Sequence, residues 1–468
     1  MPPFHFIMVV WGERFTRFFL DVTLPSQLAP DGLPAMRQLD GATYRLFTTA
    51  RDAQTIAANP AFARLSSLMA VEFVVVAPGA EPLMAGDPYA VMTAFHRRAV
   101  AEASVRAACL VFLAPDAIFS SGAFAYLERR AELGDEMVMI AAPRAAVEGA
   151  APVILDRFRR PDGTISVPAP DLVRLMIDHP HPIARAARWG MPEFCGGEPS
   201  HLYVMAGNDA FVAHCWHLHP VLVRARPDTA DFSQSIDGDY VLRTVRDPGR
   251  VHVVTSSDDV CAMELSRRDH LAERIATPGP YDRERLSEWI AARANRLHRG
   301  FFRQPVVFRT READGALVDA RLAEAASIAG GIGALAAEIA DPDCVFNVRD
   351  LVGVAHLYLY GCGRFGRSVL ALLRRSGVTA TAFIDSERAG ECDGLPVLPF
   401  AAFRDDHPAG AVVLICSMFY TPIARRLESV PDCRVLSALP LFEQHERGEL
   451  MELPLMVWNP CHLPGDTP

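Results

Sequence analysis

The chain has 468 residues, half of them hydrophobic and 22% charged, a length that predicts about three structural units. Its net charge of −10 argues against a chain-wide nucleic-acid-binding surface. All 46 basic residues are arginine, and the absence of lysine excludes Schiff-base enzymes and the GxxxxGK[ST] phosphate loop. Short-chain dehydrogenases that use a Tyr-x-x-x-Lys pair are excluded too, whereas phosphate binding by arginine is not.

The cysteines and the first residues indicate where the protein resides. The ten cysteines include no Cys-x-x-Cys pair, which leaves a zinc ribbon or a redox motif without support and suits a reducing compartment. Residues 4–11 are apolar, but they lack a basic leader and are too few to span a bilayer. We therefore expect a cytoplasmic protein without a transmembrane segment, and the sequence leaves its oligomeric state open.

In residues 1–150, apolar runs of strand length alternate with segments of helical spacing, a pattern typical of a largely parallel α/β sheet. Residues 150–265 are less regular. The expected strands are 6–10, 43–48, 71–76, 108–113, 137–141, 201–206 and 251–255. The expected helices are 13–27, 51–59, 88–107, 121–133 and 171–177.

The second half of the chain predicts a helical connector and then a second α/β unit. Residues 266–350 have helical spacing at 283–298 and 317–339. Strands are then expected at 357–360, 379–384 and 411–416, with a helix that ends near residue 376. Residues 446–468 contain several prolines and are expected to be loose.

A glycine motif lies between the first strand and the helix of this second unit. Gly361, Gly363 and Gly366 form GxGxxG, and Asp385 ends the next strand. In that context the glycines allow a tight turn, the approach of a pyrophosphate and close helix packing, and the acid binds a ribose hydroxyl. These four residues predict a site for NAD(P) or another nucleotide. The alternatives are a scaffold that binds no ligand and a domain that docks a partner.

The same region resembles a known type of domain. Residues 361–366, together with Phe383-Ile384-Asp385-Ser386 and Gly394-Leu395-Pro396-Val397, resemble the Rossmann-like nucleotide-binding domain attached to some sugar-modifying enzymes. Sugar-nucleotide acetyltransferases and certain sugar methyltransferases carry such a domain.

Residues 1–265 resemble a GT-A-type glycosyltransferase domain of bacterial surface-polysaccharide clusters. The segments that carry the resemblance are 5–12, 44–49 with Asp52, and the helix around His96, Arg97 and Arg98 followed by 110–116. The resemblance implies that Trp11, Gly12 and Thr48 line the base pocket and that Asp116 orients the donor. The predicted fold class is therefore α/β, with a GT-A-like mixed-sheet domain (1–265), a helical connector (266–350), a Rossmann-like parallel-sheet domain (351–445) and a loose tail (446–468).

The chain departs from that family at Ala114-Pro115-Asp116, which offers one carboxylate where the family's Asp-x-Asp offers two. A divalent cation, Mn or Mg, would have Asp116 as its expected ligand, and metal dependence is thereby in doubt. Arg97 or Arg98 is the candidate to neutralise the leaving diphosphate instead. The alternative is that both arginines lie on a solvated helix face.

Two further segments contain candidate residues. Asp237-Gly238-Asp239 has spacing compatible with a metal site or a catalytic base, and equally with an Asx turn at Gly238. In a strand, Cys215, His217 and His219 would share one face. We consider zinc, a phosphate or metal contact by His217 or His219, and plain packing as alternative roles for these residues.

These observations predict a glycosyltransferase that moves a sugar from a nucleotide-sugar donor to a glycan or protein acceptor in surface-polysaccharide biosynthesis. Asp237 or Asp239 would serve the acceptor. The alternatives are an NAD(P)-dependent sugar-nucleotide oxidoreductase and a non-catalytic nucleotide-sugar-binding protein. No nucleic-acid partner is expected.

Overall fold

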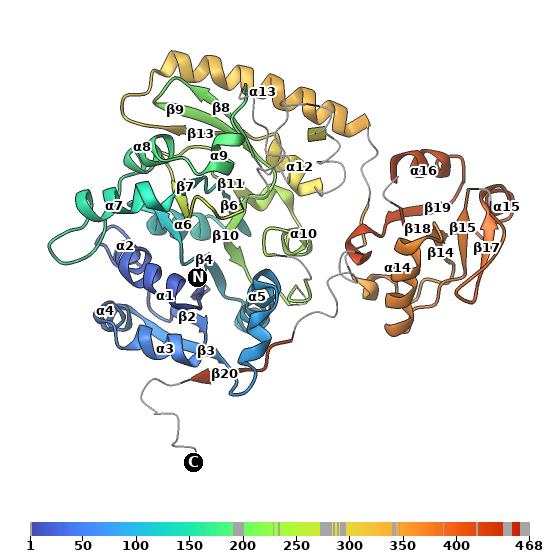
Figure 1. Cartoon of the computed structure of the whole chain (residues 1–468), viewed down its shortest axis with the longest axis horizontal. Helices are drawn as coiled ribbons and strands as arrows, with labels where there is room; N and C mark the ends of the chain where they lie inside the picture. The colour runs from blue at the N-terminus through green and yellow to red at the C-terminus, as the bar shows by residue number, and fades with distance from the viewer. Residues whose placement is uncertain are drawn as a thin grey trace. The chain divides into compact units, whose positions relative to one another are not determined.

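The computed structural model is a mixed α/β protein that divides into two compact units (Figure 1). Unit 1 comprises residues 1–286, 297–331 and 452–468, and unit 2 comprises residues 287–296 and 332–451. The structure describes residues 2–190, 201–227, 229–232, 235–271, 283, 286–287, 290, 296–338, 343–345, 347–386, 388–417, 420–442 and 452–458.

The main sheet of unit 1 has eight strands in the order β11-β6-β10-β4-β1-β2-β3-β20. Their bounds are β1 Phe4–Val9, β2 Thr43–Thr48, β3 Ala70–Val76, β4 Cys109–Leu113, β6 Met137–Ile140, β10 His219–Arg224, β11 Val251–Val253 and β20 Leu455–Trp458. Strands β1 to β4 are mutually parallel where they pair, whereas β10 runs antiparallel to both β4 and β6. Every residue of β1, β2 and β4 is buried, as expected of parallel strands covered on both faces.

Helical segments alternate with these strands along the chain. They are α1 Glu13–Phe18, the π-turn η1 Phe19–Thr23, α2 Leu24–Gln27, η2 Leu33–Ala35, α3 Ala50–Ala57, α4 Pro60–Leu68, η3 Glu81–Ala85, α5 Pro88–Val105 and α6 Ala123–Glu132. The order of the strands reverses at β1, which pairs with β2 on one side and with β4 on the other. Such a reversal opens a crevice at the carboxyl ends of the two strands, where open α/β sheets bind ligands.

Two smaller sheets complete unit 1, in the orders β5-β12-β7 and β13-β9-β8. Their strands are β5 Ala117–Phe119, β7 Arg144–Ala146, β8 His201–Ala206, β9 Ala210–Cys215, β12 Ala262–Ser266 and β13 Val306–Arg309. The accompanying helices are α7 Val147–Arg157, α8 Ala169–Asp178, α9 Pro182–Ala186, α10 Asp239–Thr244, η4 Pro248–Arg250, α12 Arg296–Phe302 and α13 Gly315–Glu338. The segment expected to be a helical connector thus contains a strand, because β13 has β9 as its antiparallel partner.

Unit 2 contains a six-stranded sheet in the order β16-β17-β15-β14-β18-β19. Its strands are β14 Leu357–Tyr360, β15 Ala382–Asp385, β16 Gly390–Cys392, β17 Leu395–Pro399, β18 Ala411–Ile415 and β19 Cys433–Ser437. All neighbours are parallel except β16 and β17. Its helices are η6 Val348–Leu351, α14 Arg364–Arg375, α15 Phe400–Asp405 and α16 Tyr420–Leu427, and the strand order again reverses at its first strand, β14.

The segment expected to be a loose tail includes the edge strand β20, which pairs antiparallel with β3 (Figure 1). The ring of Trp458 packs edge-on against Phe73, with 5.5 Å between the ring centroids. The expectation was wrong for Leu455–Trp458 because proline content says nothing about a partner strand far away in the sequence. Unit 2 is therefore inserted, in sequence, between the body of unit 1 and its last strand.

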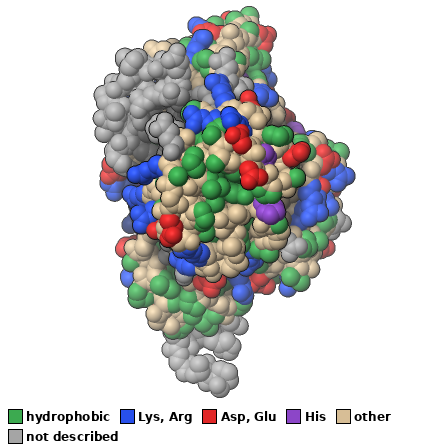
Figure 2. All heavy atoms as spheres, turned by 90° about the vertical axis from the view of Figure 1, so that its right-hand side faces the viewer, with side chains coloured by type: hydrophobic (Ala, Val, Ile, Leu, Met, Phe, Trp, Pro, Cys, Tyr) green, Lys and Arg blue, Asp and Glu red, His purple; other side chains and the backbone are tan. Residues whose placement is uncertain are grey.

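The face shown in Figure 2 carries both positive and negative side chains. On the face shown in Figure 2, arginine and acidic side chains are interspersed, and neither sign covers the part of that face that the structure describes. Over the described residues, no helix combines the length and the apolar character needed to cross a bilayer.

Candidate functional site

The crevice beside β1 begins at the turn of Trp11 and Gly12. Gly12 has a left-handed φ of 81°, and its N–H donates to Asp52 Oδ2 at 2.9 Å. The same oxygen accepts from the Thr49 hydroxyl at 2.7 Å, so the turns after β1 and β2 are bound together. The Trp11 ring lies 6.0 Å from Phe95 of α5. Thr48, expected to line the base pocket, is fully buried, so its side chain is not accessible to a donor in this structure.

Asp116 follows β4 on the other side of the crevice and is held by its backbone. The carbonyl of Asp116 accepts from the N–H of Leu265 at 2.8 Å, and that of Pro115 accepts from the Thr23 hydroxyl at 2.6 Å. Strand β12 thereby places Glu264, the neighbour of Leu265, beside Asp116. Glu264 lies opposite Arg144 of β7 in the sheet register, and the two side chains form an ion pair of 2.8 Å.

These neighbours change the acidity of Asp116. Burial raises the pKa of its carboxyl from 3.8 to about 7, and the negative charge of Glu264 acts in the same direction, against Arg144 and Arg14. A carboxyl that titrates near neutral pH can accept or donate a proton under cellular conditions. Perturbation by burial together with a specific charged neighbour is typical of functional carboxylates, although structural ones show it as well.

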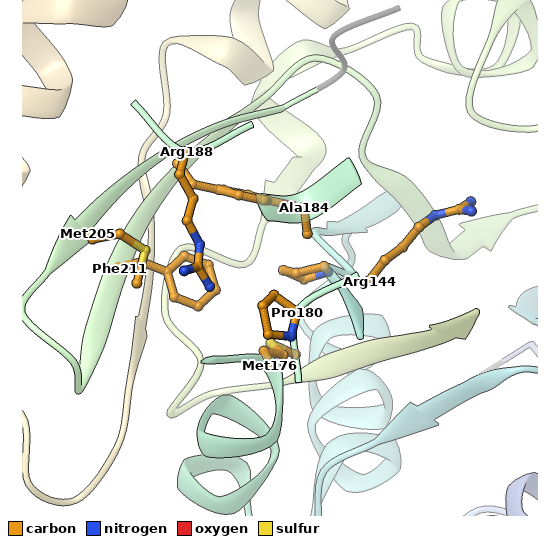
Figure 3. A pocket seen from close by; sticks show the side chains of 9 residues that line it. Arg144, Met176, Pro180, Ala184, Arg188, Met205 and Phe211 are labelled. Carbon is orange, nitrogen blue, oxygen red and sulfur yellow. The ribbon is translucent and has the colours of Figure 1, made fainter. Parts of the chain in front are cut away.

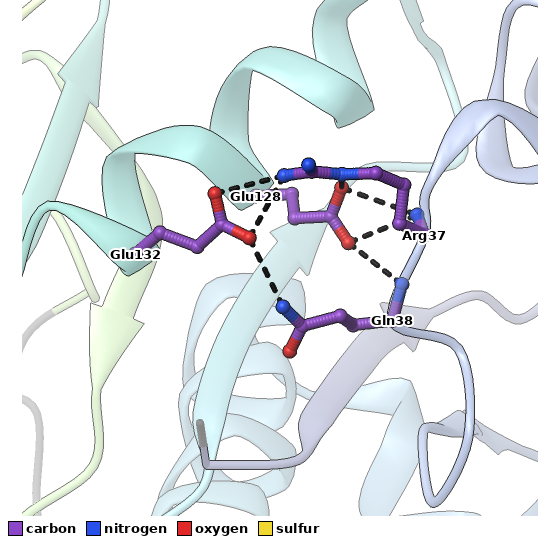
Figure 4. Close-up of polar contacts among 4 residues, drawn as sticks. All are labelled: Arg37, Gln38, Glu128 and Glu132. Atoms are coloured by element: carbon purple, nitrogen blue, oxygen red, sulfur yellow. Dashed lines mark hydrogen bonds and ion pairs between the residues drawn. The ribbon is translucent and has the colours of Figure 1, made fainter.

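Glu128 of α6 is an example of a structural buried carboxylate (Figure 4). Its oxygens accept from the backbone N–H of Arg37 at 3.0 and 3.1 Å and from that of Gln38 at 2.7 Å. The neighbouring Glu132 accepts from the guanidinium of Arg37 at 2.8 Å and from Gln38. Glu128 therefore anchors a loop, and its oxygens are engaged by protein donors.

Three histidines interact with Asp237 at the same end of the sheet: His298 is buried, and His217 and His219 are half-buried. Burial alone would raise the pKa of the Asp237 carboxyl, but His217, a hydrogen bond from Ser235, His219 and His298 together lower it. The carboxylate is therefore kept ionised among histidines. Its interactions with His217 and His219 link the loop before α10 to the start of β10.

The histidines near Asp237 come from β10, α12, α5 and the connection between β9 and β10. His219 opens β10 and its Nε2 lies 2.9 Å from the carbonyl of Phe112 in β4. The ring of His217 lies 4.5 Å from that of His298 of α12, whose Nε2 is 2.7 Å from the Asp237 carbonyl. Burial lowers the pKa of His298 and of His96 of α5 to about 3. His298 and His96 are therefore neutral near pH 7, close to an ionised Asp237 carboxylate.

The two groups, around Asp116 and around Asp237, are within electrostatic reach of one another. Burial lowers the pKa of His201 in β8 to about 3, and Arg144, the ion-pair partner of Glu264, adds to this effect. Burial also lowers the pKa of His219, which Glu264 partly offsets. Arg144, Glu264, His201 and His298 are not part of any local motif, so no sequence pattern could have identified them beside Asp116 and Asp237.

Arg97, Arg98 and Asp239 are three further residues for which the sequence allowed either a functional or a structural role. Arg98 is half exposed and pairs with Glu102 four residues along the same helix, the arrangement of a solvated helix face. Arg97 donates from Nε to the carbonyl of Ala230 at 3.3 Å and lies 4.0 Å from Asp231. Asp239 is the first residue of α10, and its side chain lies outside the described residues.

Cys215, His217 and His219 do not share one strand face, contrary to the strand hypothesis. Cys215 ends β9, His219 begins β10, and the connection between the strands contains His217. Within the described ranges, no three His, Cys, Asp or Glu side chains are arranged to hold a metal ion. Asp116 and Glu264 provide two carboxylates, and the cation already beside Glu264 is Arg144. A divalent cation at Asp116 stays a prediction.

In unit 2 the glycine motif forms the turn between β14 and α14. Gly361 has φ of 106°, and a Cβ there would lie 2.9 Å from the carbonyl oxygen of Cys416. A Cβ on Gly366 would lie 1.9 Å from the carbonyl oxygen of Gly361, so this glycine is required for helix packing alone. A Cβ on Gly363, at the start of α14, would meet no protein atom within 4 Å. Open space at this position is what a bound phosphate would need.

Asp385 ends β15 as expected and has protein neighbours. Its Oδ1 accepts from the N–H of Arg388 at 3.2 Å, and the thiol of Cys362 lies 3.5 Å from Oδ2. A ribose hydroxyl would therefore share this carboxylate with the loop after β15.

The sequence matches no family model and no curated protein. Among solved structures, one described as a glucose-1-phosphate thymidylyltransferase from Bacillus anthracis in complex with a sucrose is similar at 13% identity. The match covers 39% of this chain and 77% of the other, with a TM-score of 0.19. A similarity this low does not identify the fold or the function.

Proposed function

We propose that unit 1 is a nucleotide-sugar-dependent glycosyltransferase and that its site is the crevice between the carboxyl ends of β1 and β4. The observation that supports this most is Asp116, a carboxyl with a pKa of about 7 at the point where the strand order reverses. The base of the donor would lie at Trp11 and Gly12, at the end of β1.

The proposed transfer step assigns a role to Asp116, Arg14 and Arg144. The hydroxyl oxygen of the acceptor attacks the anomeric carbon, and the bond from that carbon to the diphosphate oxygen breaks. The Asp116 carboxylate takes the hydroxyl proton. Asp237 suits this role less well, because its lowered pKa makes it a weaker base. Arg14 and Arg144 neutralise the leaving nucleoside diphosphate.

The direct test is release of nucleoside diphosphate by the full chain from a panel of UDP-, GDP- and CDP-sugars, each with and without simple sugar acceptors. Asp116→Asn should lose turnover and keep donor binding. The matched control is Asp156→Asn, which changes an exposed carboxylate on α7. Failure to bind or turn over any donor would rule this function out.

Metal dependence is a separate question, which chelation answers. If Arg144 and Arg14 supply the positive charge, turnover should persist in EDTA. Complete loss in EDTA with recovery by Mn or Mg would instead indicate a cation at Asp116, with Glu264 as a second carboxylate. In that case Glu264→Gln should raise the metal concentration needed for recovery.

A second candidate activity belongs to unit 2, and the open space at Gly363 favours it. We propose that its glycine turn and Asp385 bind a nucleotide. Titration of the full chain with NADH, NADPH and UDP-sugars, followed by fluorescence or calorimetry, tests this. A saturable NAD(P)H signal that disappears in Gly363→Trp would favour the oxidoreductase alternative. Donor binding without turnover by the wild type would favour a non-catalytic binding role for unit 1, and unchanged turnover in Asp116→Ala would remove Asp116 from the mechanism.

A further inference from the structure

A small pocket in unit 1 lies between helices α8 and α9 and the hairpin of β8 and β9 (Figure 3). Its walls are mostly apolar, with Met176, Met205 and Phe211 among them, and Arg188 points into it. The cavity measures about 20 Å³. This is room for one or two water-sized groups and not for a whole sugar ring.

The backbone around Arg188 is fixed to β8. The N–H of Trp189 donates to the carbonyl of Tyr203 at 2.7 Å, and the N–H of Tyr203 donates to the carbonyl of Ala187 at 3.0 Å. Arg188 lies between these two bonds, so its side chain starts from a defined position. Binding a ligand would therefore cost less conformational entropy here than on a free loop.

No described acidic side chain forms an ion pair with Arg188. Burial, followed by the like charge of Arg185, lowers the pKa of its guanidinium. Arg174 of α8 is a useful comparison, since it pairs with Asp209 and lies near Asp178. An arginine cannot shed its proton at physiological pH, and a partly buried charge is costly unless an opposite charge meets it.

We propose that Arg188 and this pocket form a binding subsite for the carboxylate group of an organic ligand. The guanidinium presents a planar fork of donors that matches a carboxylate. The cavity accepts a head group of that size, and the methionine and phenylalanine walls suit the carbon atoms next to it.

The position of the pocket relative to Asp116 suggests which molecule carries the carboxylate. Arg144 lines the pocket and also pairs with Glu264, the neighbour of Asp116. A ligand anchored at Arg188 would extend toward the proposed site of transfer. That the carboxylate belongs to an acidic acceptor, such as a uronic acid, rests on the proposed function, whereas the subsite itself does not.

The test is thermal unfolding of the full chain in increasing sodium glucuronate, sodium acetate or sodium phosphate, with ionic strength held constant by sodium chloride. We expect a saturable rise in Tm with glucuronate and with acetate. Arg188→Met should weaken binding at least about tenfold, the value of a charge-assisted hydrogen bond. Arg188→Lys should give an intermediate effect. Arg160→Met, which removes an exposed arginine from a turn, should bind like the wild type.

Three outcomes would overturn the proposed subsite or its assignment to a carboxylate. The carboxylate assignment fails if phosphate alone raises the Tm. The subsite is refuted if none of the anions raises the Tm, or if Arg188→Met shows the same rise in Tm as the wild type. If Arg188→Met unfolds, Arg188→Lys decides alone, because it retains the charge and loses the fork. A working subsite in a chain that turns over no nucleotide sugar would refute the proposed transfer and leave the carboxylate site standing.

Discussion

Units 1 and 2 both have a sheet with parallel central strands whose order reverses at the first strand, yet different residues lie at the carboxyl ends of these strands. In unit 2 the features of the edge come from one short segment, Gly361 to Gly366, and from Asp385. In unit 1 they come from residues far apart in the sequence: Gly12 after β1, Asp116 after β4, Arg144 in β7 and Glu264 in β12.

The chemistry differs as well. Asp116 has a pKa raised to about 7 by burial and by Glu264. In unit 2, the turn at Gly363 has open space beside it. The Asp385 carboxylate already accepts a hydrogen bond from the N–H of Arg388, in the loop after β15. Under the proposed function, unit 1 carries the proton transfer and unit 2 binds a nucleotide.

The largest expected effect separates these two roles. Asp116→Asn should reduce sugar transfer by about 10²- to 10⁴-fold, the usual contribution of a general base, with donor affinity changed little. Asp385→Asn in unit 2 should change transfer less than threefold or so, because a ribose contact lies outside the reacting atoms. Steady-state kinetics measures both. Equal losses in the two variants would contradict the division of roles.

The glycine turn of unit 2 provides the next test. Gly366→Ala should destabilise unit 2 by about 3 kcal/mol, since the new Cβ would clash with the carbonyl of Gly361. Gly363→Ala has free space and should cost less than about 1 kcal/mol. Denaturant unfolding and hydrogen exchange of α14 measure the difference.

The two variants also test nucleotide binding. If the proposed site is correct, Gly363→Ala should weaken it while stability is kept, because the methyl group would enter the space for the phosphate. Undiminished binding in Gly363→Ala would remove the glycine turn from the site.

A third prediction concerns the last strand of unit 1. Trp458→Ala should lower the free energy of unfolding of unit 1 by about 2 kcal/mol, through loss of the packing on Phe73. Val457→Ala is the matched control, because Val457 is 61% exposed on the same strand. Chemical denaturation followed by tryptophan fluorescence, with each variant compared to its own baseline, gives both values. No difference between the variants would mean that β20 contributes little to unit 1.

The last test is the pH dependence of stability. The pKa of Asp116 is higher in the folded than in the unfolded chain, so the folded state binds the proton more tightly between pH 4 and 7. Its contribution therefore becomes less favourable as the pH rises through that window. Asp116→Asn removes this term, and its unfolding free energy relative to the wild type should increase from pH 4 to 7 by at least about 1 kcal/mol.

In the wild type and in Asp116→Asn alike, the buried histidines make the folded state more stable as the pH rises. His96 and His298 have lowered pKa values, so their contribution is lost as the pH falls below 6.5. The difference between the two unfolding curves isolates Asp116. A flat difference from pH 4 to 7 would show that its acidity is ordinary.

The sequence by itself determined much of the α/β architecture. Strand periodicity predicted β1, β2, β3 and β4 to within about two residues, because buried parallel strands are continuous apolar runs. The GxGxxG motif correctly placed a turn between β14 and α14, since its glycines act on their own neighbourhood. The lack of lysine excluded whole classes of chemistry without any structure.

Only the tertiary structure decided which residues meet. It placed Glu264 and Arg144 beside Asp116, a strand at Val306–Arg309, and Leu455–Trp458 on the edge of β3. It also separated Cys215 from His219 and left Arg188 without an acidic partner among the described residues. These relations depend on strand pairing between distant segments and on burial, neither of which has a local sequence signal, whereas hydrophobic periodicity and glycine turns do.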